Sequence, residues 1–172
     1  LLNKLSKIKY IPELDGLRAF AVLSVLLYHL EKVLIKSQIF SGGFLGVDIF
    51  FVISGYLITS IILTEIETTN NFVFSHFYER RVRRILPALF LVIIISSVVS
   101  LFILFPKSII DFSKSILSSV FFGSNIYFNY TGNNYGDDHI LLKPLVHTWS
   151  LAVEEQFYIL FPIFIFLFLK II

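Results

Sequence analysis

The sequence predicts an all-α protein, a polytopic transmembrane helix bundle with four or five spanning helices and one interfacial or re-entrant helix. Of the 172 residues, 56% are hydrophobic and only 15% are charged, and the mean hydropathy is +0.84. Soluble chains carry about 25% charged residues, so a soluble globular domain is excluded. Several apolar runs reach the roughly 20 residues that a helix needs to cross a bilayer.

The first two spans are expected at 17–35 and 44–66. Pro12 and Asp15 precede the first, where a proline and an acidic residue favour a helix start. A flexible turn of one serine and two glycines, 41–43, leads into the second.

The third span is expected at 85–105, opened by Pro87 in its first turn, where the missing N–H does no harm. The last begins near Trp149 and reaches the end of the chain, with a kink at Pro162. Since the chain ends inside an apolar run and has no Met, we expect it to be a fragment of a longer protein.

Two segments lie between these spans. Apolar residues recur at helical spacing in 108–127, but Asp111, Lys114 and several serines interrupt them, which favours an interfacial or re-entrant helix. The segment 128–143 is rich in Asn, Gly and Asp and is predicted to be a loop.

The lysines and arginines predict a cytoplasmic amino terminus. With four spans, nine of them lie inside: Lys4, Lys7, Lys9, Arg18, Arg80, Arg81, Arg83, Arg84 and Lys170. Five lie outside: Lys32, Lys36, Lys107, Lys114 and Lys143. If 108–127 also spans, Lys143 moves inside and Lys170 outside, and the charge count does not separate the two topologies.

Arg18 and His29 are ionisable residues in the first span. They are eleven positions apart, which leaves them about 20° apart on one helix face and about 16 Å apart along the axis. Asp15 can pair with Arg18 from three positions before it. His29 is a candidate proton acceptor; the alternative is that Arg18 anchors the topology and His29 is a packing residue.

Asp48 lies near the start of the second span. A short connecting turn would place it at the depth of His29, where its carboxylate could orient the imidazole and raise its basicity. Gly46, Ser54 and Gly55 would allow close helix approach. The alternative is that Asp48 only caps its helix.

The densest charge cluster, Arg80, Arg81, Arg83 and Arg84, immediately precedes the predicted third span. Arginines at such spacing can clamp phosphates bidentately. The alternative is positive-inside anchoring or contact with anionic lipid.

The stretch HTWSLAVEEQFY, 147–158, leads into the last span. Glu154 and Glu155 cannot both face lipid, so at least one is expected to act in a cavity as acid, base or hydrogen-bond partner. The alternative places both in the headgroup region. Tyr158 lies one turn beyond Glu154, and Trp149 is most simply an interfacial anchor.

Four motifs in order resemble the acyltransferase-3 family of integral-membrane O-acyltransferases. They are PELDGLR at 12–18 with His29 after ten intervening residues, GGFLGVDIFFVISGYLI at 42–58, FYERRVRRILPAL at 77–89, and HTWSLAVEEQFYILFP at 147–162. The resemblance implies that residues 1–172 are the amino-terminal half of a membrane acyltransferase domain, with the later carboxy-terminal helices missing.

The resemblance further implies an enzyme of a bacterial inner membrane. It would move an acyl group, commonly acetyl, from cytoplasmic acyl-CoA to a hydroxyl of a surface glycan such as peptidoglycan or lipopolysaccharide. Acetyl-CoA, the glycan acceptor and membrane lipid are then the expected partners, with no metal and no nucleic acid.

The motifs assign residues to this chemistry. Arg18, Arg81 and Arg84 would bind the donor, although Arg80 and Arg83 give a second pair with the same spacing. His29 would be the catalytic residue. From the residues themselves we expect Asp48 and Glu154 to act with it, and Glu155, Tyr158 and Trp149 to contact the acceptor. Two other hypotheses stay open: a proton-coupled transporter or flippase half, in which His29, Asp48 and Glu154 form a relay, and a sensor without catalytic activity.

Overall fold

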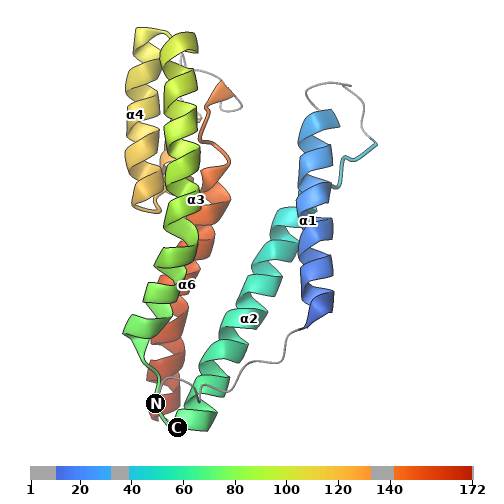
Figure 1. The fold of residues 1–172 in the computed structure, drawn as a ribbon, viewed down its shortest axis with the longest axis vertical. Coiled ribbons are helices and arrows are strands. Elements are labelled where there is room, and N and C mark those ends of the chain that lie inside the picture. Colours follow the sequence, from blue (N-terminus) through green and yellow to red (C-terminus); the bar gives the residue numbers. More distant parts are fainter. Residues whose placement is uncertain (1–10, 32–38, 133–141, 172) are drawn as a thin grey trace. The chain divides into compact units, whose positions relative to one another are not determined.

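The computed structural model describes residues 11–31, 39–132 and 142–171, and these residues form helices and no strand (Figure 1). The helices are α1 (Pro12–Leu30), α2 (Leu45–Thr69), α3 (Phe74–Ile103), α4 (Pro106–Val120), α5 (Ser124–Thr131) and α6 (Thr148–Ile171). The predicted all-α fold is confirmed. The chain divides into two compact units, residues 1–72 and 73–172.

The first unit pairs α1 with α2. Pro12 is at the start of α1, and Glu13 and Asp15 lie in its first turn, so the predicted start signals are confirmed. The helix nevertheless begins five residues before the expected Leu17, because these residues are themselves favourable in a first helical turn. The predicted end at Ile35 falls outside the described residues.

α2 agrees closely with the predicted 44–66 and runs three residues further. It ends where Asn70 adopts a left-handed conformation, φ 52°, which asparagine tolerates better than most residues. Gly46 is buried against α1: a Cβ there would overlap the carbonyl oxygen of Ala21 and lie 2.8 Å from Cγ2 of Val25. The predicted close approach of helices at Gly46 is therefore confirmed.

Glu31, directly after α1, stabilises the backbone at residues 39 and 40, which precede α2. Its carboxylate is buried and accepts hydrogen bonds from the backbone N–H groups of Ile39 and Phe40, the second at 2.6 Å. Backbone donors satisfy a buried carboxylate that would otherwise be costly. Nothing in the sequence pattern drew attention to this residue.

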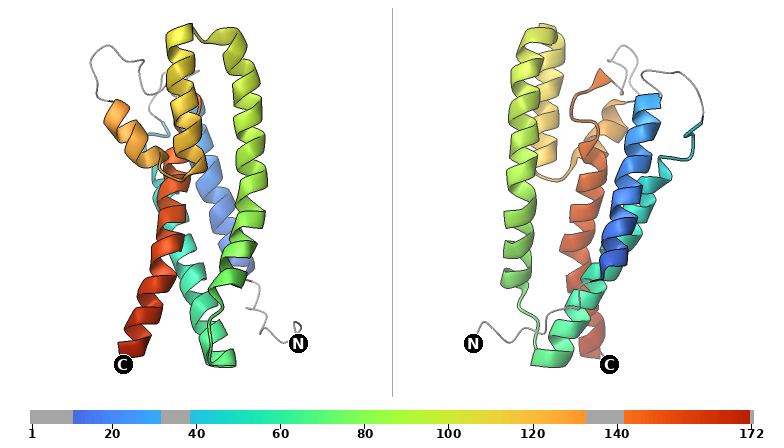
Figure 2. Two further views of the ribbon diagram at one scale, coloured as in Figure 1. Left: turned by 90° about the vertical axis from the view of Figure 1, so that its left-hand side faces the viewer. Right: turned by 45° about the vertical axis from the view of Figure 1, so that its right-hand side comes forward.

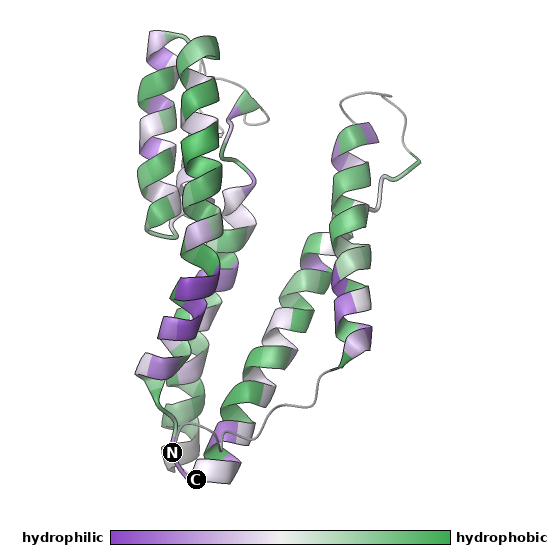
Figure 3. Cartoon of the chain, in the orientation of Figure 1, coloured by the Kyte–Doolittle hydropathy of each residue, from purple (hydrophilic) through white to green (hydrophobic). Residues whose placement is uncertain are grey.

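α3 corrects the prediction for the third span. It begins at Phe74, not Ile85, so Pro87 lies inside the helix instead of in its first turn. Arginine is a good helix former, and the arginine cluster extends the helix towards its amino end (Figure 3, purple band on α3). Pro87 cannot bond the carbonyl four residues earlier, and the long helix continues past it.

The segment 108–127 forms two helices where one was predicted. α4 returns along α3 (Figures 1 and 2), a turn follows at 121–123, and α5 begins at Ser124. Phe122 has a φ of 52°, which breaks the helical path. Because α5 extends to Thr131, the loop predicted to start at Phe128 starts later, and residues 133–141 of that loop lie outside the described residues.

The second unit has one apolar core. Leu89 and Ile93 of α3 meet Phe112 of α4, Phe128 of α5 and Leu145, which precedes α6. This core places the start of α6 beside the middle of α3.

Polar side chains join α6 to α4 and α5. Thr148 bonds Ser119 at 2.9 Å, and its carbonyl accepts from Ser124 at 2.9 Å. Asn125 and Gln156 exchange two amide hydrogen bonds of 3.0 Å. Interhelical hydrogen bonds of this kind stabilise the association of membrane helices.

Three helices are long and apolar enough to cross a membrane: α2, α3 and α6 over 148–168. α1 has 19 residues, but three of its first seven, Glu13, Asp15 and Arg18, are charged. Its role as a fourth span therefore stays a prediction. α4, with 15 residues, is shorter than the roughly 20 needed to span.

Candidate active site

The first group of candidate residues lies on α1. Arg18 Nη1 is 3.4 Å from Oδ1 of Asp15, as the spacing predicted. His29 is exposed in the last turn, with its ring edge-on to Tyr28. Because α1 is continuous from Pro12 to Leu30, Arg18 and His29 share one face of a single rigid element.

Asp48 lies elsewhere than its predicted place beside His29. Gly43 packs against Ser24 and Tyr28, and Gly46 against Ala21, so Asp48 is level with about residue 21 of α1. That is about eight residues, or about 12 Å, from the level of His29. The chain folds back along α1 before α2 begins, which moves Asp48 down the helix.

Asp48 also faces a different direction. It is two positions, about 200°, beyond Gly46, whose face meets α1, and its side chain is exposed. Within the described residues no hydrogen bond joins Asp48 to His29. The first unit therefore does not bring Asp48 beside His29, and a part for Asp48 in proton transfer stays a prediction.

The second group begins with the arginine cluster of α3. Arg83 pairs with Glu79 one turn before it, at 2.8 Å, and both side chains are exposed. Arg80 and Arg84 are also exposed, whereas Arg81 is half-buried. The four arginines are therefore in different surroundings, although the sequence gives them as one run.

Arg81 reaches α6. Its guanidinium carbon lies 4.3 Å from the ring centroid of Tyr158, which is buried, and 5.7 Å from that of Phe77. The Tyr158 hydroxyl donates to the carboxylate of Glu154. A residue predicted for the donor thus contacts a residue predicted for the acceptor.

Glu155 completes this group, which we call the carboxylate site: Arg81, Glu154, Glu155 and Tyr158. The Glu155 side chain is only 7% exposed, and its Oε1 has no hydrogen-bond partner among the described residues. The charges of Glu154 and Arg81 both act on it. Trp149 is exposed in the first turn of α6, two turns before the carboxylate site.

α3 and α6 are antiparallel at the carboxylate site. Phe74 meets Phe166 with ring centroids 5.7 Å apart, and the Tyr78 hydroxyl donates to the carbonyl of Ile159 at 3.0 Å. These contacts lie on one side of the Arg81–Tyr158 pair, towards the amino end of α3, and fix the register of the two helices there.

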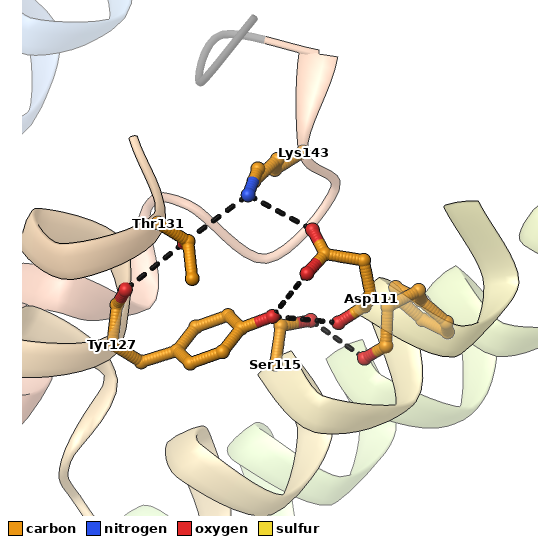
Figure 4. A network of polar contacts seen from close by, with 6 residues as sticks. Asp111, Ser115, Tyr127, Thr131 and Lys143 are labelled. Atoms are coloured by element: carbon orange, nitrogen blue, oxygen red, sulfur yellow. Dashed lines mark hydrogen bonds and ion pairs between the residues drawn. The ribbon is translucent and has the colours of Figure 1, made fainter. Parts of the chain in front are cut away.

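A polar network that the sequence patterns did not reveal joins α4, α5 and the approach to α6 (Figure 4). Lys143 is buried, and its Nζ lies 2.8 Å from Oδ2 of Asp111 and 3.1 Å from Oγ1 of Thr131. The Tyr127 hydroxyl donates to the same aspartate. Asp111 and Lys143 are far apart in the sequence, and Lys143 fell in a predicted loop, so no local pattern linked them.

This network stabilises the ionised form of Asp111. Burial acts to raise the pKa of its carboxyl, but hydrogen bonds from Lys143 and Tyr127, with the charges of Lys143 and Lys114, outweigh burial and lower that pKa. Asp111 is therefore a carboxylate near neutral pH.

The candidate residues thus fall into one group in each unit. Arg18, His29 and Asp48 belong to the first, and Arg81, Arg84, Glu154, Glu155, Tyr158 and Trp149 to the second. Among the described residues, no three His, Asp or Glu side chains gather closely enough to hold a metal ion.

Curated relatives match nearly the whole chain. It is 43% identical over 162 residues, 94% of its length, to a peptidoglycan O-acetyltransferase of Listeria monocytogenes. It is 45% identical over 161 residues to a putative O-acetyltransferase of Staphylococcus aureus and 43% identical over 165 residues to the O-acetyltransferase OatA of that species.

The chain covers 25% of the Listeria protein and 26% of each Staphylococcus protein, so it spans about a quarter of the length of these relatives. No solved structure matches it. The acyltransferase domain family matches residues 11–172. This match covers all four motifs and nearly all of the chain, and the chain therefore belongs to the acyltransferase-3 family.

Proposed function

We propose that the protein containing this chain is a membrane O-acyltransferase that moves an acetyl group from cytoplasmic acetyl-CoA to a hydroxyl of a cell-wall glycan. Three helices suited to a membrane and membership of an acyltransferase family support this proposal. Relatives named for peptidoglycan O-acetylation favour that glycan as acceptor.

One observation carries the proposal: α1 is unbroken between Arg18 and His29. A rigid helix holds a cation and a titratable imidazole on the same face, about 16 Å apart along its axis. This arrangement suits a donor whose phosphates are bound at one level while its acyl group reacts at another.

In this proposal His29 removes the proton from the acceptor hydroxyl or passes on the acyl group. Arg18 and the arginine cluster around Arg81 and Arg84 hold the phosphates through charge-assisted hydrogen bonds. The further roles proposed are Asp48 and Glu154 in proton transfer, and Glu155, Tyr158 and Trp149 in contact with the acceptor.

The side of the membrane follows the charge distribution. An amino terminus in the cytoplasm of a bacterial plasma membrane places the arginine cluster where acyl-CoA is available. Lys4, Lys7 and Lys9, which support this orientation, lie outside the described residues.

The experiment that tests the function is His29→Ala in the full-length protein. We expect glycan O-acetylation, measured as acetate released by mild base, to fall by about 10²–10⁴-fold, the usual contribution of a general base. His76→Ala is the matched control, because His76 is an exposed histidine of α3 outside both groups of candidate residues.

Normal O-acetylation by His29→Ala at wild-type protein levels would reject the catalytic assignment. Consumption of acetyl-CoA by the purified wild-type protein separates an acyltransferase from a transporter, which would leave the donor unchanged.

A further inference from the structure

We propose that the arginines of the Arg81–Arg84 motif have separate tasks: Arg81 is the counterion of Glu154 and Glu155 and positions α6, whereas Arg84 contacts the donor's phosphates. This inference rests on the proposed acyl-donor function. It replaces the donor-binding role proposed above for Arg81 with a role toward the protein's own carboxylates, and it keeps the donor-binding role of Arg84.

The surroundings of Arg81 are those of an internal counterion. It is half-buried, and its guanidinium lies over the face of Tyr158 at 4.3 Å. Such a contact is strengthened where water is excluded. The Tyr158 hydroxyl in turn donates a hydrogen bond to Glu154. The guanidinium, the ring and the carboxylate therefore form one connected network between α3 and α6.

Glu155 gives a second, independent reason. It is buried, one of its oxygens lacks a hydrogen-bond partner among the described residues, and the charges of Glu154 and Arg81 act on it. Two adjacent carboxylates in an apolar helix need a nearby cation, since a buried charge without compensation is strongly unfavourable. Arg81 contacts this part of α6 through the ring of Tyr158, and its charge acts on Glu155.

Arg84 differs from Arg81 in both its exposure and its contacts. Its side chain is exposed, and it makes no ion pair within the described part of the chain. A phosphate requires an arginine whose planar fork is open for two parallel hydrogen bonds. If Arg81 turned to a phosphate, Glu155 would lose the positive charge that acts on it, whereas Arg84 can bind a phosphate without giving up an ion pair.

Charge rescue distinguishes a counterion from a phosphate ligand. Arg81→Gln and Arg84→Gln are made in the full-length protein, each alone and each combined with Glu155→Gln, which removes one negative charge and preserves the side-chain shape. Arg83→Gln on the same helix shows what the loss of an exposed charge costs by itself. The measurements are the affinity for adenosine 3′,5′-bisphosphate, which carries phosphates but no acyl arm, and the unfolding temperature in detergent.

We expect Arg84→Gln to weaken nucleotide binding by about tenfold or more, the cost of a charge-assisted hydrogen bond, with no recovery when Glu155→Gln is added. Arg81→Gln should lower the unfolding temperature, and Glu155→Gln should restore both that temperature and nucleotide binding. Recovery only in the Arg81 pair is specific to a counterion, because a generally damaged helix would not be repaired by a change on α6.

Nucleotide binding that is lost in Arg81→Gln as in Arg84→Gln, and is not recovered with Glu155→Gln, would overturn the proposal. Should the wild-type protein bind no nucleotide, the proposed function fails, but the unfolding temperatures still decide whether Arg81 balances Glu155. Arg81→Gln that is too unstable to purify alone is judged by the double variant, whose recovery supports the counterion and whose failure rejects it.

Discussion

Lys143 is a cation that the fold buries almost completely, at 6% exposure. Its ammonium is balanced by Asp111 and donates to Thr131, so the lysine ties the approach to α6 to both α4 and α5. In the sequence Lys143 contributed only a positive charge to the topology count, whereas in the structure it stabilises the packing of the second unit. The sequence could not predict this, because the partner carboxylate lies on α4, far from Lys143 in the sequence.

Lys143→Met should therefore destabilise the second unit. The change leaves Asp111 without its closest cation, and we expect a loss of about 2 kcal/mol, less than for a fully buried pair because water reaches part of Asp111. Thermal unfolding in detergent measures it. Lys114→Met is the comparison, because Lys114 is exposed and acts on Asp111 only through its charge; equal losses in both variants would contradict the pairing.

The lowered pKa of Asp111 also predicts sensitivity to acid. The folded state binds this proton more weakly than the unfolded state, so the stabilisation is complete above the unfolded pKa, about 3.9 for aspartate, and is lost as the pH falls through the lower folded value. Unfolding temperatures of the wild type and Asp111→Asn should converge as the pH falls from about 5 to about 3. A constant difference over this range would show that Asp111 titrates alike in both states.

At the scale of elements, the residues that favour a helix start were identified for α1 and α2, although α1 begins five residues before the expected Leu17. Pro12 and Asp15 mark α1, and paired glycines precede α2. The first eleven residues of α3 were not predicted to be helical. Their charged residues suggested a flank outside the membrane span, and Pro87 suggested the first turn of the helix. A proline is compatible with either position, and only the packing of Arg81 and Tyr78 on α6 decides between them.

The closeness of α1 and α2 makes Gly46 a sensitive position. Gly46→Ala would push a Cβ into the carbonyl of Ala21, and we expect the unfolding temperature and the amount of folded protein to fall. Gly16→Ala is the matched control in the same unit, because a Cβ there meets nothing within 4 Å and alanine favours the helix by about 0.5–1 kcal/mol. A stable Gly46→Ala protein would show that the two helices can separate at little cost.

At the scale of the whole molecule, family and fold class followed from ordered motifs and apolar runs, both of which are local in sequence. Contacts between residues that are distant in the sequence could not be predicted from these local patterns. The Arg81–Tyr158 contact and the register of Asp48 depend on how helices pack, which hydropathy does not encode. The roles of the candidate residues stay predictions for the same reason: chemistry requires their arrangement in space.

Orientation in the membrane can be tested directly, because the 172 residues contain no cysteine. A single cysteine at Lys114 of α4 should react with an impermeant maleimide in intact cells, and one at Arg83 of α3 only after permeabilisation. Both positions are exposed, and the apolar part of α3, which follows Arg83, lies between them in the chain. The reverse labelling pattern would place the amino terminus outside and reject a cytoplasmic arginine cluster.

The reciprocal amides of Asn125 and Gln156 behave differently from the ion pair of Asp111 and Lys143. Each amide gives one hydrogen bond and takes one from the other, and Gln156 also donates to the carbonyl of Phe122 at 2.8 Å. Neither group gains or loses a proton in water near physiological pH, and neither is weakened by salt as exposed charges are. The contact between α5 and α6 should therefore persist at low pH or high salt, where the Asp111–Lys143 contact weakens. Under these conditions α5 would reorient about its contact with α6 instead of detaching.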